Sequence, residues 1–156
     1  MKGLNFSALW ASALRVPALR NGLRAIALSG LVTLSAPTAA AAQMSTADQD
    51  YLNSLYSFLQ AQDTTAYGLA TNEMRDEGNI WIAKTFCQSF ERGASPADVY
   101  SVYMSAVMDA IGPGSGEAYE QATYAIGLYS GSVMNLGSAY YCPQYQPQVE
   151  QALRSL

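Results

Sequence analysis

The chain has 156 residues, with 12 acidic and 8 basic side chains, two cysteines and no histidine. Without histidine it cannot form a Ser–His–Asp or Cys–His nucleophile arrangement, or a histidine-ligated metal site. Its acidic balance disfavours binding to nucleic acid and to anionic lipid.

The first 42 residues are typical of a secretory leader. Four basic residues and no acidic one precede an apolar run at residues 25–34, which is too short to span a bilayer. Three alanines ending at Ala42 fit the small-residue cleavage pattern, so we expect cleavage after Ala42 and Gln43 as the new N-terminus. An uncleaved amphipathic anchor is the alternative. The leader indicates a secreted or periplasmic protein.

Cleavage would make the chain more acidic. Four of the 8 basic residues leave and all 12 acidic ones stay, so residues 43–156 carry a net charge of 4 − 12 = −8. We therefore expect no nucleic-acid partner and, once the leader is removed, no membrane partner. Residues 43–156 are enough for a single domain with its own core.

The two cysteines, Cys87 and Cys142, are expected to form one disulfide in an oxidising compartment. They are not arranged as Cys-x-x-Cys, so a structural bond is favoured over a redox pair. Together with the helical periodicity described below, the pair predicts an all-α fold: a small bundle of about four helices stapled by one disulfide.

A first helix is predicted to begin at Ser45 or Thr46, which can cap its N-terminus. Its apolar residues recur every three or four positions and should face the core: Tyr51, Leu52, Leu55, Phe58 and Leu59. Residues 66–71 are predicted to be a loop or a single helical turn.

A second helix should begin near Thr71 or Asn72, carry Cys87 on its core face and end at a left-handed Gly93. A third should begin at Ser95, with proline at its first helical position. The buried stripe expected for this third helix contains Val99, Val102, Tyr103, Ala106 and Ala110.

A fourth helix is predicted from about residue 117 to the region of Ser138, ending before Pro143. Its buried face should contain Ala118, Ala122, Ala125, Tyr129 and Val133. Gly127 and Gly131 form a strip of small residues where another backbone could approach. Its long uncharged stretch makes only a poor membrane span, and residues 147–156 should form a short terminal helix or fray.

Several short segments together resemble the secreted domain of unknown function 732. They are the Tyr51–Leu59 run, Phe86-Cys87, the Phe-Glu-Arg-Gly-Ala-Ser-Pro segment at residues 90–96, and Tyr141-Cys142-Pro143. The similarity covers about residues 48–144, although residues 112–141 are more extended than the family pattern. It implies a small exported helical domain with one disulfide and no established activity.

The tyrosines suggest how the domain acts, because all 11 lie after the leader and rings with hydroxyls are common at binding surfaces. The possible partner surface comprises Tyr100, Tyr103, Tyr119, Tyr124, Tyr129, Tyr140 and Tyr141. We expect a non-enzymatic interaction or structural module of the cell envelope or extracellular space, with a protein partner there and no cofactor. The alternative for these residues is that they fill the edge of a small core.

Two other functions are weighed against the module. Glu73, Asp76 and Glu77 could serve a carboxylate and tyrosine-based enzyme acting on envelope glycan, although their spacing is also that of a solvated helix start. The second of these functions is that of an accessory to an envelope sensor. The glycine-rich residues 112–116 resemble a phosphate loop only superficially and are read as a linker. The oligomeric state is left open.

Overall fold

The computed structural model describes residues 44–155, with the side chains of residues 110 and 111 excepted. The predicted leader and the predicted cleavage site after Ala42 lie outside this range. The described chain is all-α, as predicted. Its long helices are α2 (Thr46–Gln62), α4 (Arg75–Glu91), α5 (Pro96–Ile111) and α6 (Glu117–Tyr141). The shorter elements are α3 (Thr64–Gly68), the π-helical turn η2 (Leu69–Met74), the 3-10 turn η3 (Pro143–Tyr145) and α7 (Gln146–Leu153).

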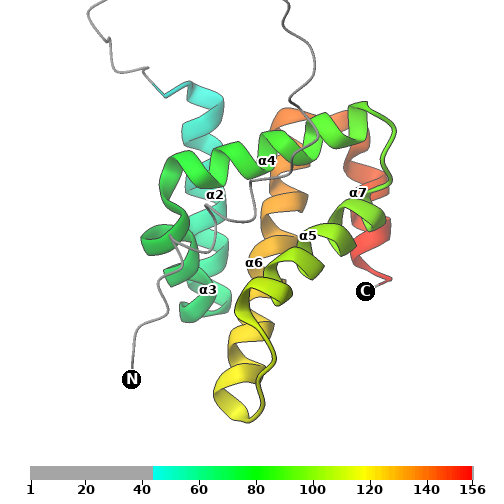
Figure 1. Ribbon diagram of the computed structural model, residues 1–156. Helices are drawn as coiled ribbons and strands as arrows, with labels where there is room; N and C mark the ends of the chain where they lie inside the picture. The colour runs from blue at the N-terminus through cyan, green and yellow to red at the C-terminus, as the bar shows by residue number, and fades with distance from the viewer. Residues whose placement is uncertain (1–43, 156) are drawn as a thin grey trace, which may run out of the picture. The chain divides into compact units, whose positions relative to one another are not determined.

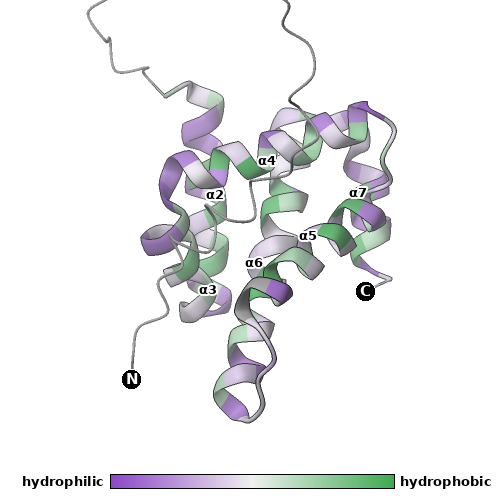
Figure 2. Cartoon of the chain, viewed as in Figure 1, coloured by the Kyte–Doolittle hydropathy of each residue, from purple (hydrophilic) through white to green (hydrophobic). Residues whose placement is uncertain are grey.

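Helix α6 is the centre of the fold, since α2, α4, α5 and α7 all pack against it. Figure 1 shows α4 lying across α2 and α6, with α5 running obliquely and α7 beside the C-terminal part of α6. The core forms mainly where α2, α4 and α6 meet, and its fully buried apolar residues include Leu55, Leu59, Ala83, Ala125, Val133 and Met134. Apolar residues also recur along much of α5 (Figure 2).

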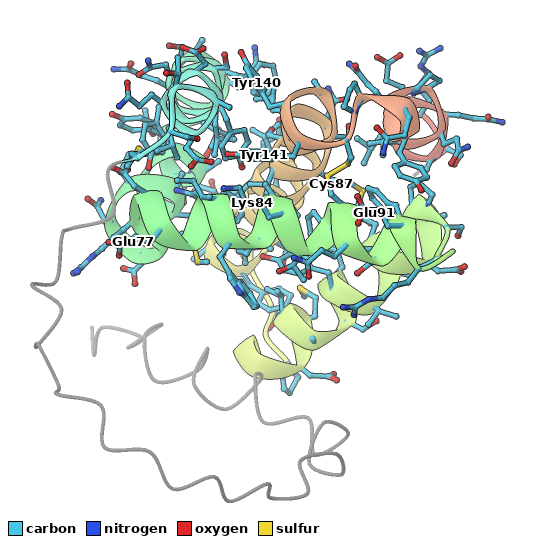
Figure 3. All side chains as sticks on the ribbon, turned by 90° about the horizontal axis from the view of Figure 1, so that it is seen from above. Glu77, Lys84, Cys87, Glu91, Tyr140 and Tyr141 are labelled. Carbon is cyan, nitrogen blue, oxygen red and sulfur yellow. A yellow bond between two sulfur atoms is a disulfide. The ribbon has the colours of Figure 1, made fainter. Side chains whose placement is uncertain are left out.

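The predicted disulfide is present. It joins Cys87 in α4 to Cys142, the C-terminal cap of α6, with a Cα–Cα distance of 5.8 Å. Both cysteines are buried, and Figure 3 shows Cys87 beside the end of α6. The bond therefore fixes the end of the central helix to the helix that crosses it.

The predicted helix caps are confirmed where they depend on local sequence. The Ser45 hydroxyl accepts a hydrogen bond from the Asp48 backbone N–H at 3.2 Å, and the Ser95 hydroxyl accepts one from the Asp98 N–H at 3.2 Å. Gly93 follows the C-terminal cap of α4 and has a φ of 90°, a conformation that favours glycine. Local side-chain chemistry therefore sets these boundaries.

The start of the second long helix was predicted wrongly. Residues 66–71 follow the helical alternative rather than the loop, and extend it beyond a single turn, because Asp63 caps α3 by accepting the Ala66 N–H at 2.7 Å and the chain continues into η2. Helix α4 then begins at Arg75, not at Thr71 or Asn72, and Arg75 has a φ of 57°. This conformation is costly for a residue with a side chain, so tertiary contacts must stabilise it.

Three of the predicted buried stripes also need correction, and on α6 the exception is Ala118, which is exposed. Phe58 on α2 is 43% exposed and Val102 on α5 is 71% exposed, while Ala106 is exposed as well. Helix α5 contacts the core through Tyr103, whose ring packs edge-on against Phe86 with centroids 5.3 Å apart. Because α5 is apolar around much of its circumference, periodicity could not identify which side faces the core.

Helices α4 and α6 approach most closely at Gly137. A Cβ atom added there would lie 2.8 Å from the Ala83 Cβ and 3.2 Å from the Ala83 Cα. The same addition at Gly131 would meet only the Leu153 Cδ2, at 3.7 Å. The close crossing of two backbones therefore occurs at Gly137, six residues beyond the Gly127–Gly131 strip that the sequence indicated.

This difference predicts opposite effects for one substitution at two glycines. Gly137→Ala should lower the free energy of unfolding by about 1–2 kcal/mol, because overpacking against Ala83 outweighs the gain in helix propensity. Gly131→Ala should raise it by up to about 1 kcal/mol, because alanine fits there and favours the helix. Urea unfolding of both variants measures the difference. A change of the same sign in both would contradict the close α4–α6 contact.

Candidate binding groove

A buried polar network holds the N-terminal half of α4 against α2 and α6. The side-chain N–H groups of Asn79 point to the backbone carbonyls of Ala70 at 2.9 Å and Arg75 at 2.8 Å, and to the Tyr56 hydroxyl at 3.1 Å. Its Oδ1 accepts a hydrogen bond from the Tyr129 hydroxyl at 2.7 Å. Asn79 is fully buried, so these bonds satisfy its polar groups and also those of the irregular η2–α4 junction.

A second polar cluster joins the ends of α2 and α6 to α4. The Asp48 carboxylate lies 2.8 Å from the Lys84 ammonium group and accepts a hydrogen bond from the Tyr141 hydroxyl at 2.8 Å. The Lys84 ammonium group also lies 5.0 Å from the centre of the Tyr141 ring. Figure 3 shows Lys84 and Tyr141 beside each other above α4. We call these three residues the Asp48 clasp.

The clasp makes the carboxyl group of Asp48 unusually acidic. Burial raises its pKa, but hydrogen bonds with Lys84, Ser45 and Tyr141 outweigh burial and lower the pKa from 3.8 to about 2. Because the pKa is depressed in the folded state, the stabilisation is present above pH 3.8 and is lost as the pH falls through about 2.

Asp48→Asn should therefore remove part of the acid sensitivity of folding. At neutral pH the variant should be less stable than the original by at most about 2 kcal/mol, and the difference should shrink as the pH falls from about 4 to 2. Urea unfolding across this pH range measures the effect. Asp50→Asn, on the exposed side of the same helix, is the control. If the two variants showed the same pH dependence, the clasp would not stabilise the fold.

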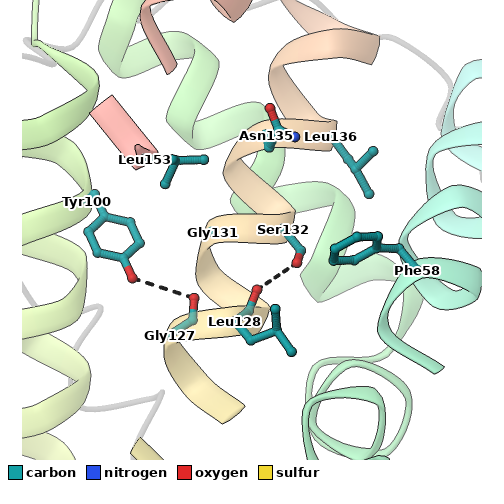
Figure 4. A pocket seen from close by; sticks show the side chains of 9 residues that line it. All are labelled: Phe58, Tyr100, Gly127, Leu128, Gly131, Ser132, Asn135, Leu136 and Leu153. Carbon is teal, nitrogen blue, oxygen red and sulfur yellow. Dashed lines mark hydrogen bonds between the residues drawn. The ribbon is translucent and has the colours of Figure 1, made fainter. Parts of the chain in front are cut away.

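An open groove runs along the side of α6 between three other helices. Its volume is about 340 Å³. Residues of α6 make the floor. They form three neighbouring pairs that repeat every four positions and therefore share one face of the helix: Gly127 and Leu128, Gly131 and Ser132, and Asn135 and Leu136. Figure 4 shows Phe58 from α2 on one side of this floor, and Tyr100 from α5 and Leu153 from α7 on the other.

The groove explains two features that the sequence left open. Gly127 and Gly131 lower its floor, because a side chain at either position would extend toward Tyr100 or Leu153. Phe58, predicted to be buried, is instead an exposed wall of the groove. The glycine spacing was therefore the sequence signal for this site, while nothing in the periodicity of α2 distinguished Phe58 from its buried neighbours.

The polar groups of the groove are few. The Ser132 hydroxyl donates to the Leu128 carbonyl at 2.6 Å, and the Tyr100 hydroxyl points to the Gly127 carbonyl at 3.5 Å. Burial raises the pKa of Tyr100, which favours the protonated hydroxyl. The Oδ1 of Asn135 is buried and accepts no hydrogen bond from any described residue. An unpaired buried acceptor of this kind normally costs about 1–3 kcal/mol.

The seven tyrosines proposed from the sequence do not form one surface. Tyr129 is buried in the Asn79 network, and Tyr141 belongs to the Asp48 clasp. The two rings classed as exposed, Tyr124 and Tyr140, are 16 positions apart on α6, or about 24 Å along the helix. Of the seven, Tyr100 lines the groove, and Tyr124 adjoins it by helical spacing, four positions before Leu128.

Neither Tyr103 nor Tyr119 lines the groove, and the exposed ring of Tyr140 also has another partner. Tyr103 packs on Phe86, and Tyr140 pairs with Ser54, with 2.7 Å between the two hydroxyl oxygens. Tyr119 is half-buried near the start of α6, beside Gly114. These positions do not extend the groove.

The candidate carboxylates lie elsewhere. Asp76 accepts a hydrogen bond from the Tyr56 hydroxyl at 2.6 Å, and Glu73 and Glu77 are exposed around the start of α4. Figure 3 shows Glu77 and Glu91 toward opposite ends of α4. Among residues 44–155, no group of three or more acidic, cysteine or histidine residues is arranged to hold a metal ion. Within the same range, no helix has the length and hydrophobicity needed to cross a bilayer.

Neither a family model, nor a curated protein, nor a solved structure matches the chain. The similarity to the domain of unknown function 732 therefore stays a prediction.

Proposed function

We propose that this chain is an exported, non-enzymatic binding module of the cell envelope or extracellular space, and that it binds through the groove along α6. The observation that carries this proposal is an apolar groove left open between helices that are otherwise held together by a buried disulfide and buried polar networks. A rigid scaffold with one concave apolar surface is typical of a binding site. The leader and the disulfide support export.

The groove favours binding over catalysis. Its lining contains no carboxylate, and the acidic residues considered for glycan hydrolysis lie in η2 and at the start of α4. A carboxylate-based enzyme would need a pair of such groups within one site. We therefore expect no turnover of envelope glycan by the mature chain, and no difference when Glu77 is changed to Gln.

The proposal is tested by comparing the molecules that the original chain captures with those that a variant with a filled groove captures. Residues 43–156 would be immobilised and exposed to an extract of the producing cell's envelope and medium, beside Gly131→Leu and Gln88→Leu variants. The leucine at Gly131 enters the groove, whereas Gln88 is an exposed position of α4 outside it. We expect a molecule that the original chain and Gln88→Leu retain and Gly131→Leu does not. Equal retention by all three, or retention of nothing, would overturn the proposal.

A further inference from the structure

We propose that the groove along α6 takes an uncharged, largely apolar small molecule that carries one N–H or O–H group. This inference rests on the function proposed above and adds the class of ligand. It is drawn from the size of the groove, the chemistry of its lining and the state of Asn135.

The size of the groove favours a small molecule. Its volume of about 340 Å³ lies at the lower end of the range for ligand pockets, which is roughly 300–1,000 Å³. Side chains from α2, α5 and α7 flank it, so an occupant on the α6 floor contacts side chains on both sides. The aromatic rings of Phe58 and Tyr100 present apolar surface to a flat or aliphatic body.

The lining favours an uncharged ligand. None of its nine residues carries a charge, and four of them, including Phe58 and Leu136, are large apolar side chains. An anion or cation entering this surface would lose hydration without gaining a partner of opposite charge. A neutral ligand avoids that cost.

Asn135 supplies the polar contact. Its Oδ1 lacks a hydrogen-bond partner among the described residues, although the side chain lines the groove. In Figure 4 this oxygen points away from Tyr100 and Leu153. The terminal torsion of asparagine is soft, so rotation about it turns the amide oxygen toward the groove when a ligand is bound. A ligand N–H or O–H group would then satisfy an acceptor that is otherwise unpaired.

Two fluorescent probes test the charge preference. N-phenyl-1-naphthylamine is neutral and has one N–H group, and 8-anilino-1-naphthalenesulfonate has a similar ring system with an added sulfonate. We expect the neutral probe to bind residues 43–156 with one-to-one saturation, and roughly ten-fold or more tightly than the sulfonate. Gly131→Leu should abolish binding, and Gln88→Leu should leave it unchanged.

A second pair of ligands tests Asn135. 1-Naphthol and naphthalene, which differ by one hydroxyl, would be compared as competitors of the neutral probe. In Asn135→Leu the ratio of the affinity for 1-naphthol to that for naphthalene should fall by about two- to ten-fold, because the hydrogen bond from the naphthol hydroxyl to Asn135 is removed. This variant should fold at least as stably as the original, since leucine removes an unpaired polar atom. An unchanged preference would remove Asn135 from the site and overturn the N–H or O–H requirement.

The result for the neutral probe also separates this inference from the proposed function. Absent binding, binding unaffected by Gly131→Leu, or equal binding of the sulfonate would each overturn the ligand class. If a protein captured from the extract still required an open groove, the binding module would stand and its occupant would be a side chain of that protein. If capture were also insensitive to Gly131→Leu, the proposal that the chain binds through this groove would be overturned as well.

Discussion

Cys142→Ser will lower the free energy of unfolding of residues 43–156 by about 2–5 kcal/mol and their melting temperature by many degrees. The bond joins residues 55 positions apart, so it removes much of the conformational freedom of the unfolded chain. It also tethers the end of α6, where Cys142 is fully buried. Loss of the bond therefore weakens the helix against which the other helices pack.

The measurement is thermal and urea unfolding with and without reductant. Reduction of the original chain should reproduce the effect of Cys142→Ser. A double variant, Cys87→Ala with Cys142→Ala, should be insensitive to reductant, which separates loss of the bond from side effects of the reagent. If Cys142→Ser melted like the original chain, the disulfide would not be what stabilises the α4–α6 packing.

Asn79→Ala should be comparably destabilising, by about 3–5 kcal/mol. The substitution leaves the Tyr129 hydroxyl without its acceptor and removes the side-chain N–H group that donates to the Ala70 carbonyl. Asn79 is fully buried, so water does not replace these bonds. The substitution also opens a cavity between α2, α4 and α6. Urea unfolding measures the change, with Asn53→Ala as a control at an exposed position of α2.

A double-mutant cycle makes this prediction specific to the network. Tyr129→Phe removes the hydroxyl that donates to Asn79, so its cost should be largely absent in the Asn79→Ala background. A coupling energy of about 1 kcal/mol or more is expected. Strictly additive effects would show that Asn79 acts by filling space alone.

The sequence predicted the helix ends that depend on neighbouring residues, and the disulfide, for which only two cysteines are present. The caps at Ser45 and Ser95, the left-handed Gly93 and the Cys87–Cys142 bond are of this kind. Each depends on side-chain chemistry that acts over a few positions, or on the presence of only two cysteines.

The irregular η2–α4 junction could not be predicted, because its stabilisation comes from distant residues. Arg75 adopts a φ of 57°, which the local sequence disfavours, and the Arg75 carbonyl is held by the side chain of Asn79. Asn79 in turn depends on Tyr129, 50 positions further along the chain. No spacing within α4 indicates such a contact.

The groove was only partly predictable for a similar reason. Gly127 and Gly131 marked the right face of α6, but the walls come from α2, α5 and α7, whose positions depend on the tertiary packing. The tyrosine count pointed to binding, yet Tyr129 and Tyr141 serve internal contacts. Composition cannot distinguish a tyrosine that binds a partner from one that completes a buried network.

Binding at the groove is tested most directly by ¹H–¹⁵N correlation spectra of labelled residues 43–156, recorded before and after addition of the captured and purified molecule. The backbone amide signals of Gly127 and Gly131 should move, and Gly131→Leu should suppress the remaining shifts along α6. Trp81, which is 48% exposed on α4, should be unaffected. Shifts centred on Trp81 and its α4 neighbours, with the two glycine signals unmoved, would contradict binding through the groove.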